Sequence, residues 1–310
     1  MKLATSISDF AAHTKNWADA VRQFEGTGFR YLDFNFYNVI YPNSPFLGDQ
    51  WQKEVIDAKE AAEELGFSFV QAHSPNYNPQ GANVDHEAGI LATVRSIEAC
   101  GMLGIPNIVV HTGFSLDYLY PDDKKGYFER NRKFVEQLYP AMEKYNVNVL
   151  VENSTQANMG KQYFYMHGQE MYDFAEFCNH PLLHACWDTG HANVEGCDQY
   201  REIKDLGKHL KAIHFNDNFG KADQHLCPFV GTMDIDSVIQ GLLDIRYEGY
   251  CTFESNVLLR SNRWPDYRKK DPSIAEHPCE TPSLELYRKA ESLLYEVGKH
   301  ILTTYHCFEE

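Results

Sequence analysis

The sequence predicts a single (β/α)8 barrel, the TIM-barrel class, over residues 1–310, and three observations support this prediction. Eight short apolar segments alternate with eight helix-like segments, a pattern typical of a parallel sheet covered by helices. The length of 310 residues accommodates eight such units, since a barrel of this class takes roughly 250 residues. The first apolar segment lacks the glycine-rich phosphate turn that a doubly wound open sheet would carry there.

The expected strands are short, and several are rich in β-branched or aromatic residues. Strands of a parallel sheet have this composition because helices cover both faces of the sheet. In chain order they are LATSIS (3–8), YLDFNF (31–36), FSFVQAH (67–73), NIVVHT (107–112), NVNVLVENS (146–154), LLHACWDTG (182–190), LKAIHFND (210–217) and YCTFES (250–255).

Helical periodicity is clearest in two segments. Residues 50–65 end before Gly66, which is typical of a helix stop, and residues 85–103 begin at Asp85, a suitable N-cap. The second segment carries one apolar side, formed by Ile90, Leu91, Val94, Ile97 and Cys100. The other helices are expected at 15–25, 128–145, 169–179, 198–209, 236–245 and 285–302.

The remaining length falls into loops that follow strands and therefore share one face of the barrel. We expect these active-site loops at 35–49, 113–127, 154–168, 218–233 and 255–283. They are aromatic and polar, and either pack among themselves or cover a pocket. The aromatic residues are Tyr37, Tyr41, Phe114, Tyr118, Tyr120, Tyr163, Phe164, Tyr165 and Trp264.

The composition argues against a nucleic-acid partner. The formal net charge is -16, from 44 acidic and 28 basic residues, so a polyanion is repelled overall. Only 260-RSNRWPDYRKK-270 is a basic stretch. The eight cysteines form no CxxC pair, which favours reduced thiols. With no signal-peptide pattern and no apolar run of membrane-spanning length, we expect a cytoplasmic protein without a membrane partner.

Ionisable residues close six of the eight expected strands. They are His73, His111, Glu152, Asp188 with His191 one turn later, His214 and Glu254. Active sites of such barrels form at the carboxyl ends of the strands, so these residues are expected to converge. Buried carboxylates need a cation or hydrogen-bond partners. Two Glu, one Asp and one His suit a divalent metal ion, namely Mn²⁺, Mg²⁺, Co²⁺ or Zn²⁺, and the many histidines favour Zn²⁺ or Mn²⁺ and disfavour Ca²⁺.

Several of these segments resemble one known superfamily, the xylose isomerase-like barrels, which include sugar phosphate isomerases and epimerases and endonuclease IV. The segments are HSPNY (73–77), VVHTG (109–113), VLVEN (149–153), WDTGHAN (187–193), IHFND (213–217), DQH (223–225) and FES (253–255). The resemblance runs from the third strand to the eighth. Its combination of DTGH with HxND is specific for the superfamily and much less so for a substrate.

The resemblance to ketose epimerases implies an isomerase or epimerase that acts on a small sugar, sugar phosphate or polyol. It implies one divalent ion held by Glu152, Asp188, His214 and Glu254, with Glu152 and Glu254 as the catalytic acid and base. The histidine of DTGH, here His191, would bind a substrate oxygen. This chemistry moves a proton next to a carbonyl through a metal-stabilised enediolate. A hydride shift of the kind that xylose isomerases use stays open.

Two rival functions share this set of residues. The resemblance to endonuclease IV implies a three-zinc phosphodiesterase, whose additional ligands would be His73, His111, His191, Asp223 and His225. In the isomerase branch the same residues would bind sugar hydroxyls or support the metal ligands. An inosose dehydratase-type lyase would share the metal site and enolate chemistry.

A few neighbouring residues and the assembly state have weaker signals. Trp187 is expected in the core. Asn153, Asn216 and Asp217 either orient metal ligands through hydrogen bonds or form turns, and the sequence does not decide between these roles. A homodimer is left open, since dimers are common among such barrels.

Overall fold

Eight parallel strands close into one barrel in the computed structural model, which describes residues 1–255, 259 and 282–310. Each strand pairs with the next, and the eighth returns to pair with the first. The strands are β1 (Lys2–Ser6), β2 (Tyr31–Asn35), β3 (Ser68–His73), β4 (Asn107–Val109), β5 (Asn148–Glu152), β6 (Leu183–Asp188), β7 (Leu210–Phe215) and β8 (Tyr250–Phe253). The predicted fold class is confirmed.

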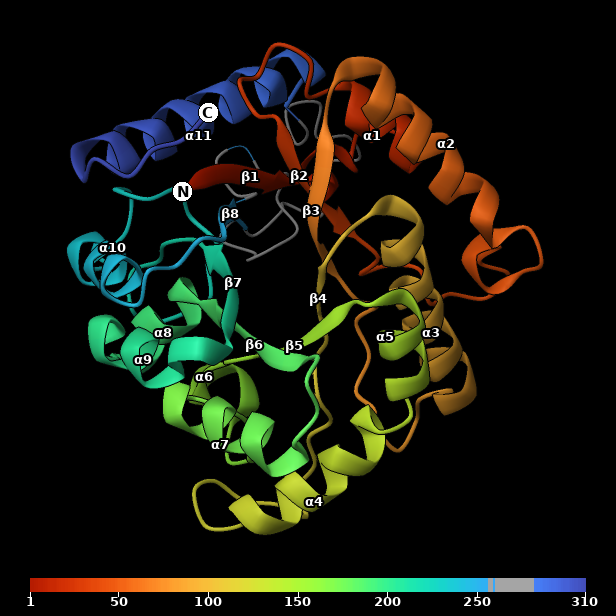
Figure 1. The fold of residues 1–310 in the computed structure, drawn as a ribbon, viewed down its shortest axis with the longest axis vertical. Helices are drawn as coiled ribbons and strands as arrows, with labels where there is room; N and C mark the ends of the chain where they lie inside the picture. The colour runs from red at the N-terminus through yellow and green to blue at the C-terminus, as the bar shows by residue number, and fades with distance from the viewer. Residues whose placement is uncertain (256–258, 260–281) are drawn as a thin grey trace, which may run out of the picture.

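Helices form an outer ring around the strands, and α11 closes the ring beside the N-terminal strand (Figure 1). The α-helices are α1 (Trp17–Arg22), α2 (Trp51–Leu65), α3 (His86–Leu103), α4 (Lys124–Val135), α5 (Tyr139–Tyr145), α6 (Gln156–Met159), α7 (Gly168–Cys178), α8 (Thr189–Glu195), α9 (Gln199–Leu206), α10 (Ile235–Asp244) and α11 (Leu284–Thr304). Short 3-10 helices are η1 (Ile7–Phe10), η2 (Pro45–Leu47) and η3 (Gly207–His209). In the described part of the chain, no helix combines the length and apolarity needed to cross a bilayer.

The helix termini follow the expected local chemistry. The Asp85 side chain accepts a hydrogen bond from the amide of Ala88 at 3.0 Å, which caps α3, and Gly66 ends α2 with a φ of 74°. The helix expected at 128–145 is two helices instead, because Pro140 lies in the first turn of α5 and could not continue the preceding helix. Helices α6 and α8 were not expected. Helix α6 lies in the predicted loop 154–168, and α8 begins at Thr189, inside the segment 182–190 that was predicted as a strand.

The predicted buried side of α3 is only partly correct. Ile97 and Cys100 are fully buried, but Leu91 is 41% exposed. The face that meets the barrel is formed largely by small residues, namely Gly89, Ala92, Thr93, Ser96 and Ala99. Small side chains let the helix approach the sheet closely, so the buried side does not coincide with the most apolar one.

The barrel interior is layered, and this layering positions the site. Val109, Leu150, Cys186 and Ala212 form a separate buried apolar cluster contributed by four consecutive strands. Side chains alternate between the two faces of a strand, so the residue two positions further on points to the same interior. Two positions beyond these four residues stand His111, Glu152, Asp188 and His214. The apolar layer is therefore a floor beneath a layer of ionisable side chains.

Candidate metal centre and substrate cavity

Four ionisable side chains meet at the carboxyl ends of β5 to β8. Glu152 and Asp188 are the last residues of β5 and β6, His214 is the penultimate residue of β7, and Glu254 directly follows β8. Glu152, Asp188 and His214 are buried, and the side chain of Glu254 is 24% exposed. The sequence correctly predicted that these four would converge.

The distances within this group are those of a ligand set. One donor atom from each residue lies within 4.8 Å of the others. Nδ1 of His214 is 2.5 Å from Oε1 of Glu152, 3.3 Å from Oε2 of Glu254 and 3.9 Å from Oδ2 of Asp188. His214 therefore occupies the centre of three carboxylates.

The chemistry of the group fits a divalent cation. Three carboxylates in a buried position are costly without a positive charge. Among the described residues, no Lys or Arg forms an ion pair with Glu152, Asp188 or Glu254, and histidines are their only cationic neighbours. Three oxygen donors with one imidazole suit Mn²⁺, Mg²⁺, Co²⁺ or Zn²⁺.

The protonation states follow from this crowding. Burial raises the pKa of Glu152, but His214 and His111 outweigh burial and hold that pKa well below its usual range. Burial opposes the charged form of His214, yet Cys186 and Glu152 raise its pKa well above the usual value. Burial raises the pKa of Asp188 to about 6 although His191 opposes the shift. An imidazolium at His214 thus balances the carboxylates in this state.

Asp188 is held from several sides. Nδ2 of Asn216 donates to Oδ2 of Asp188 at 2.8 Å, and the backbone amide of His191 donates to Oδ1 at 2.6 Å. Asn153 bonds through its side chain to both the amide and the carbonyl of Asp188, at 2.7 and 3.0 Å. Asp217 instead accepts hydrogen bonds from backbone amides of the following loop, including that of Gly231 at 2.8 Å. Asn153 and Asn216 therefore orient a ligand, whereas Asp217 shapes a loop.

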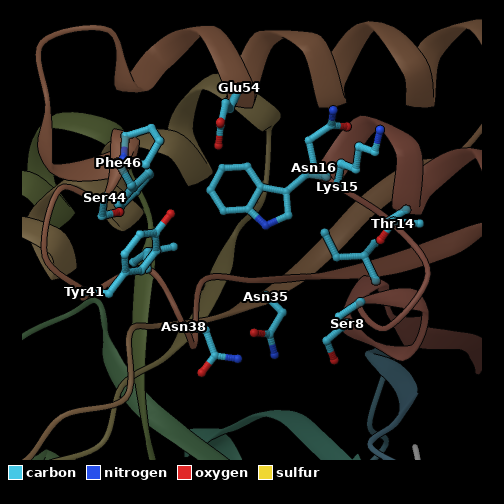
Figure 2. Close-up of a pocket in the computed structure, with 16 residues that line it drawn as sticks. Ser8, Thr14, Lys15, Asn16, Asn35, Asn38, Tyr41, Ser44, Phe46 and Glu54 are labelled. Carbon is cyan, nitrogen blue, oxygen red and sulfur yellow. The ribbon is translucent and has the colours of Figure 1, made fainter. Parts of the chain in front are cut away.

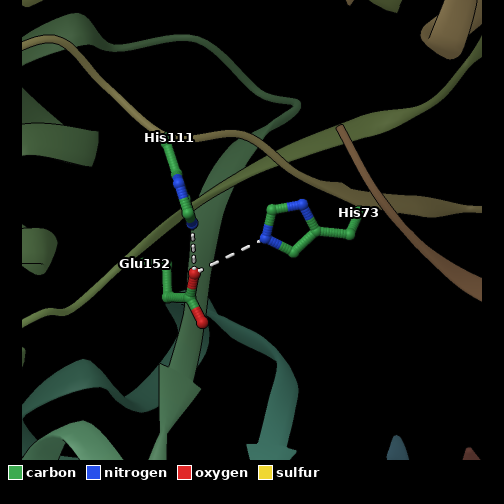
Figure 3. Close-up of side chains that lie close together, drawn as sticks. All are labelled: His73, His111 and Glu152. Atoms are coloured by element: carbon green, nitrogen blue, oxygen red, sulfur yellow. Dashed lines mark hydrogen bonds and ion pairs between the residues drawn. The ribbon is translucent and has the colours of Figure 1, made fainter. Parts of the chain in front are cut away.

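Two histidines converge on the other oxygen of Glu152 (Figure 3). Nε2 of His111 lies 2.8 Å from Oε2 of Glu152, and Nε2 of His73 lies 3.9 Å from the same atom. Nδ1 of His73 donates to the carbonyl of Ser74, and burial together with His111 lowers the pKa of His73 to about 4. A neutral imidazole with a free Nε2 can bind either a metal ion or a substrate hydroxyl. His111 lies two residues beyond the end of β4, although it was expected to end that strand.

The segment 223-DQH-225 forms its own charged group. The carboxylate of Asp223 lies between two histidines, 3.1 Å from Nε2 of His191 and 3.1 Å from Nε2 of His225. The other ring nitrogens bond to carbonyls, His191 to Asn153 and His225 to Glu254, at 2.9 Å each. Despite burial, the two histidines hold the pKa of Asp223 far below its usual range. Through His191, Asp223 is connected to α8, which directly follows Asp188, and through His225 it is connected to the backbone of Glu254.

Comparison with known protein families shows to which family the chain belongs. The model of the xylose isomerase-like TIM barrel family matches residues 23–270. The chain belongs to this family. A curated relative, the uncharacterized protein y4fM of Sinorhizobium fredii, is 25% identical over 176 residues, which cover 54% of this chain and 53% of that protein. The match thus spans only about half the length of this relative.

Several solved structures share the fold of this xylose isomerase-like barrel. The D-psicose 3-epimerase of Clostridium cellulolyticum H10 is 17% identical, with a TM-score of 0.71 and coverage of 97% of this chain and 99% of that one. The family 2 AP endonuclease of Brucella melitensis is 16% identical, with a TM-score of 0.62 and coverage of 82% and 93%. At these identities the likeness establishes the fold alone.

The centre of this xylose isomerase-like barrel opens into a cavity of about 600 Å³, a size that suits a small molecule. Its described walls combine histidines and carboxylates with Tyr37, Phe114 and Phe164, and contain no Lys or Arg. Three of the predicted loop aromatics therefore do line the cavity. Tyr163 and Tyr165 are instead buried in the core, and Trp264 lies outside the described residues.

Several amide side chains of the cavity were missed in the sequence. Asn76 and Asn78 follow β3, and Asn158 belongs to α6. Asn78 is engaged with the backbone of Phe114, accepting from its amide at 3.0 Å and donating to its carbonyl at 2.8 Å. The two asparagines at 76 and 78, three and five positions after the histidine that ends β3, were the available signal. The loop 255–283 lies almost entirely outside the described residues.

Proposed function

We propose that this protein is a divalent-metal-dependent sugar epimerase or isomerase that moves a proton at the carbon next to a carbonyl. One observation carries the proposal. Glu152 and Glu254 line the same cavity, and both belong to a group of three carboxylates and one histidine in which only Glu254 is partly exposed. Proton transfer at carbon needs carboxylates placed at the reacting atom, and both are available here.

The two glutamates come from strands that are not neighbours, β5 and the end of β8. A sugar bound between them would meet one carboxylate on each face of the reacting carbon. One carboxylate removes the proton, and the other returns a proton to the opposite face, which inverts the centre. Substrate configuration decides which glutamate acts first.

The residues suited to a divalent ion are Glu152, Asp188, His214 and Glu254. Such an ion supplies Lewis-acid stabilisation for the negative charge that develops on the carbonyl oxygen. Asn216 and Asn153 hold Asp188 in place, and His111 holds Glu152 at 2.8 Å. His73, His191 and His225 line the cavity. His73 can bond to a sugar hydroxyl through its free Nε2, whereas both ring nitrogens of His191 and His225 are bonded to Asp223 and to backbone carbonyls. The fold shared with a D-psicose 3-epimerase agrees with this assignment.

A phosphodiesterase acting on DNA is the second candidate, and one observation favours it. His73, His111 and Glu152 form a further group whose donor atoms lie within 4.8 Å of one another, so a second metal position is available. Two observations weigh against it. The described cavity walls carry no Lys or Arg to hold phosphates, and the chain has a net charge of -16. A dehydratase that acts on an inositol ketone would use the same carboxylates and is the third candidate function.

Three parallel measurements separate these functions. Metal analysis of the purified protein should give about one Mn²⁺, Co²⁺ or Zn²⁺ per chain, whereas three tightly held Zn²⁺ ions would favour the phosphodiesterase. The metal-loaded protein should epimerise or isomerise at least one ketose from a panel of ketoses and inositol ketones. It should leave a DNA duplex with an abasic site intact. Incision of that duplex without turnover of any ketose would refute the proposal.

A further inference from the structure

A second cavity, of about 220 Å³, adjoins the catalytic one, with which it shares lining residues. Its walls come from the segment after β1, the loop after β2, and helices α1 and α2. Figure 2 shows Ser8, Asn35 and Asn38 along one side, with Tyr41 and Phe46 on another and Lys15 opposite them. The metal-ligand candidates do not belong to it.

The two cavities share a wall. Ser8, Ala11, Asn35 and Asn38 line both of them. Strand β1 is also the partner of β8, the strand that Glu254 directly follows. A molecule at the catalytic glutamates could therefore extend past Asn35 and Asn38 into the second cavity.

The second cavity is built as a binding surface rather than as ordinary loop packing. Trp17 is held by edge-on contacts with Phe34 and Phe46, with ring centroids 4.8 and 5.8 Å away, and it remains partly exposed. Within the described residues, the side chains of Lys15, Asn38 and Glu54 form no hydrogen bond. A rigid aromatic wall beside free polar groups is the usual composition of a small-molecule site.

The polar groups indicate a neutral, hydroxyl-rich occupant. Lys15 and Glu54 carry opposite charges, so the cavity has no net charge from these two residues. Asparagine, serine and tyrosine side chains both donate and accept hydrogen bonds, as sugar hydroxyls require. The electron-rich face of an aromatic ring attracts the weakly positive C–H groups of a sugar ring. A charged or wholly apolar substituent would leave part of this wall unmatched.

We propose that the substrate is a glycosylated ketose, whose second sugar ring occupies the cavity lined by Trp17, Tyr41 and Phe46. The inference rests on the proposed epimerase or isomerase function and names its substrate class. The ketose unit lies between Glu152 and Glu254, and the glycosyl unit extends across Asn35 and Asn38. Binding energy from this remote ring then contributes to the reaction at the ketose.

The test compares D-fructose with two keto-disaccharides, isomaltulose and lactulose, in D2O with the metal-loaded protein. Deuterium incorporation next to the carbonyl gives kcat/KM for each sugar. We expect at least one disaccharide to exceed D-fructose by about tenfold or more. The variant Tyr41→Ala, at a position that is 50% exposed and tolerant of change, should lower the ratio of disaccharide to D-fructose kcat/KM about tenfold. Lys15→Ala should also lower this ratio of kcat/KM values.

Matched controls separate binding from folding. Lys125→Ala removes a lysine whose side chain is 88% exposed, in a helix that does not line either cavity, and should leave the ratio unchanged. Saturation-transfer NMR on the metal-free protein should show contact with the glucosyl protons of isomaltulose, and Tyr41→Ala should remove this contact. The NMR result does not depend on turnover.

Three outcomes would overturn the inference. The first is a kcat/KM for D-fructose equal to or above that of both disaccharides. The second is an unchanged ratio in Tyr41→Ala and Lys15→Ala. The third is a stronger preference for a positively charged amine adduct of fructose than for either disaccharide. If only D-fructose exchanges deuterium, the role proposed for the second cavity is wrong and the proposed function stands. If no sugar exchanges deuterium, the proposed function and this inference are both wrong.

Discussion

Nδ2 of Asn216 donates a 2.8 Å hydrogen bond to Oδ2 of Asp188, and both side chains are fully buried. The bond leaves Asp188 in one orientation toward His214 and the two glutamates. Replacing Asn216 by Ala should therefore weaken Mn²⁺ binding by about 10- to 100-fold, the usual effect of losing a residue that orients a ligand. Isothermal titration with Mn²⁺ measures this directly.

The matched control for that variant is Asn148→Ala. Asn148 begins β5 at the opposite end of the barrel and bonds to Asn107 at 2.9 Å. Its loss should lower the free energy of unfolding modestly and leave the Mn²⁺ dissociation constant unchanged. If both variants weaken Mn²⁺ binding equally, the role assigned to Asn216 is wrong.

Gly190 should not tolerate a larger side chain, for a steric reason. A Cβ placed on Gly190 would overlap Oδ1 of Asn216, so Gly190→Ala must displace the asparagine that orients Asp188. We expect Gly190→Ala to weaken Mn²⁺ binding about as much as Asn216→Ala. The double variant should bind no more weakly than Asn216→Ala alone, because both changes act on the same contact. Additive losses in the double variant would contradict this coupling.

Loading the site with metal should stabilise the fold. Each ion that binds only the folded chain adds about 2.7 kcal/mol at a concentration 100 times its dissociation constant. Differential scanning fluorimetry should show an increase of several degrees in Tm when Mn²⁺ or Zn²⁺ is added to chelator-treated protein. Asp188→Asn and His214→Gln should reduce or abolish that increase. A Tm that does not respond to any divalent ion would contradict the metal centre.

A second buried acidic pair makes stability depend on pH. Asp9 and Glu291 both lie within hydrogen-bond distance of the Thr5 hydroxyl, at 3.1 and 3.3 Å, and both are buried. Burial raises the pKa of Asp9 to about 7, and burial together with Asp9 raises the pKa of Glu291 well above its usual value. Folded-state pKa values above the unfolded ones favour the protonated pair. The protonated form of Asp9 therefore stabilises the fold. This stabilisation is full below the unfolded-state pKa of 3.8 and is lost as pH rises through the folded-state pKa of about 7.

Asp9→Asn should therefore stabilise the protein selectively at alkaline pH. At about pH 8 we expect the free energy of unfolding to rise by on the order of 2 kcal/mol, because a buried charge is removed. At about pH 4 the change should be near zero. Urea unfolding at both pH values measures it, with Asp122→Asn at an exposed position as the control. An equal loss of stability at both pH values would mean that the carboxylate is required.

The barrel and its ligand set could be predicted because both follow from local patterns. Alternation of apolar and helical segments indicated a parallel sheet, and parallel strands bring their carboxyl ends to one face. Glu152, Asp188, His214 and Glu254 each directly follow or end an apolar run, so their meeting needed no knowledge of side-chain packing. The assignment of Trp187 to the core is confirmed for the same reason, since it is fully buried and its indole bonds to Gln199 at 3.1 Å.

Features that depend on three-dimensional packing could not be predicted. Sequence spacing does not reveal that Asp223 lies between His191 and His225, because His191 belongs to α8 whereas Asp223 and His225 belong to the loop after β7. The role of Asn216 became clear only from its bond to Asp188, whereas the adjacent Asp217 holds loop amides. The cavity beside Trp17 depends on how α1, α2 and the loop after β2 pack together. Leu91 is exposed because close helix packing selected small residues instead.

Solvent-deuterium exchange with Glu152→Gln and Glu254→Gln variants tests the central claim most directly. In D2O and saturating Mn²⁺, the unaltered protein should incorporate deuterium at the carbon next to the carbonyl of a reactive ketose. Each variant should lose roughly 10²- to 10⁴-fold in exchange rate, because a positioned carboxylate contributes that much to proton transfer. Epimerised or isomerised product without solvent deuterium, or full exchange in both variants, would contradict the two-carboxylate mechanism.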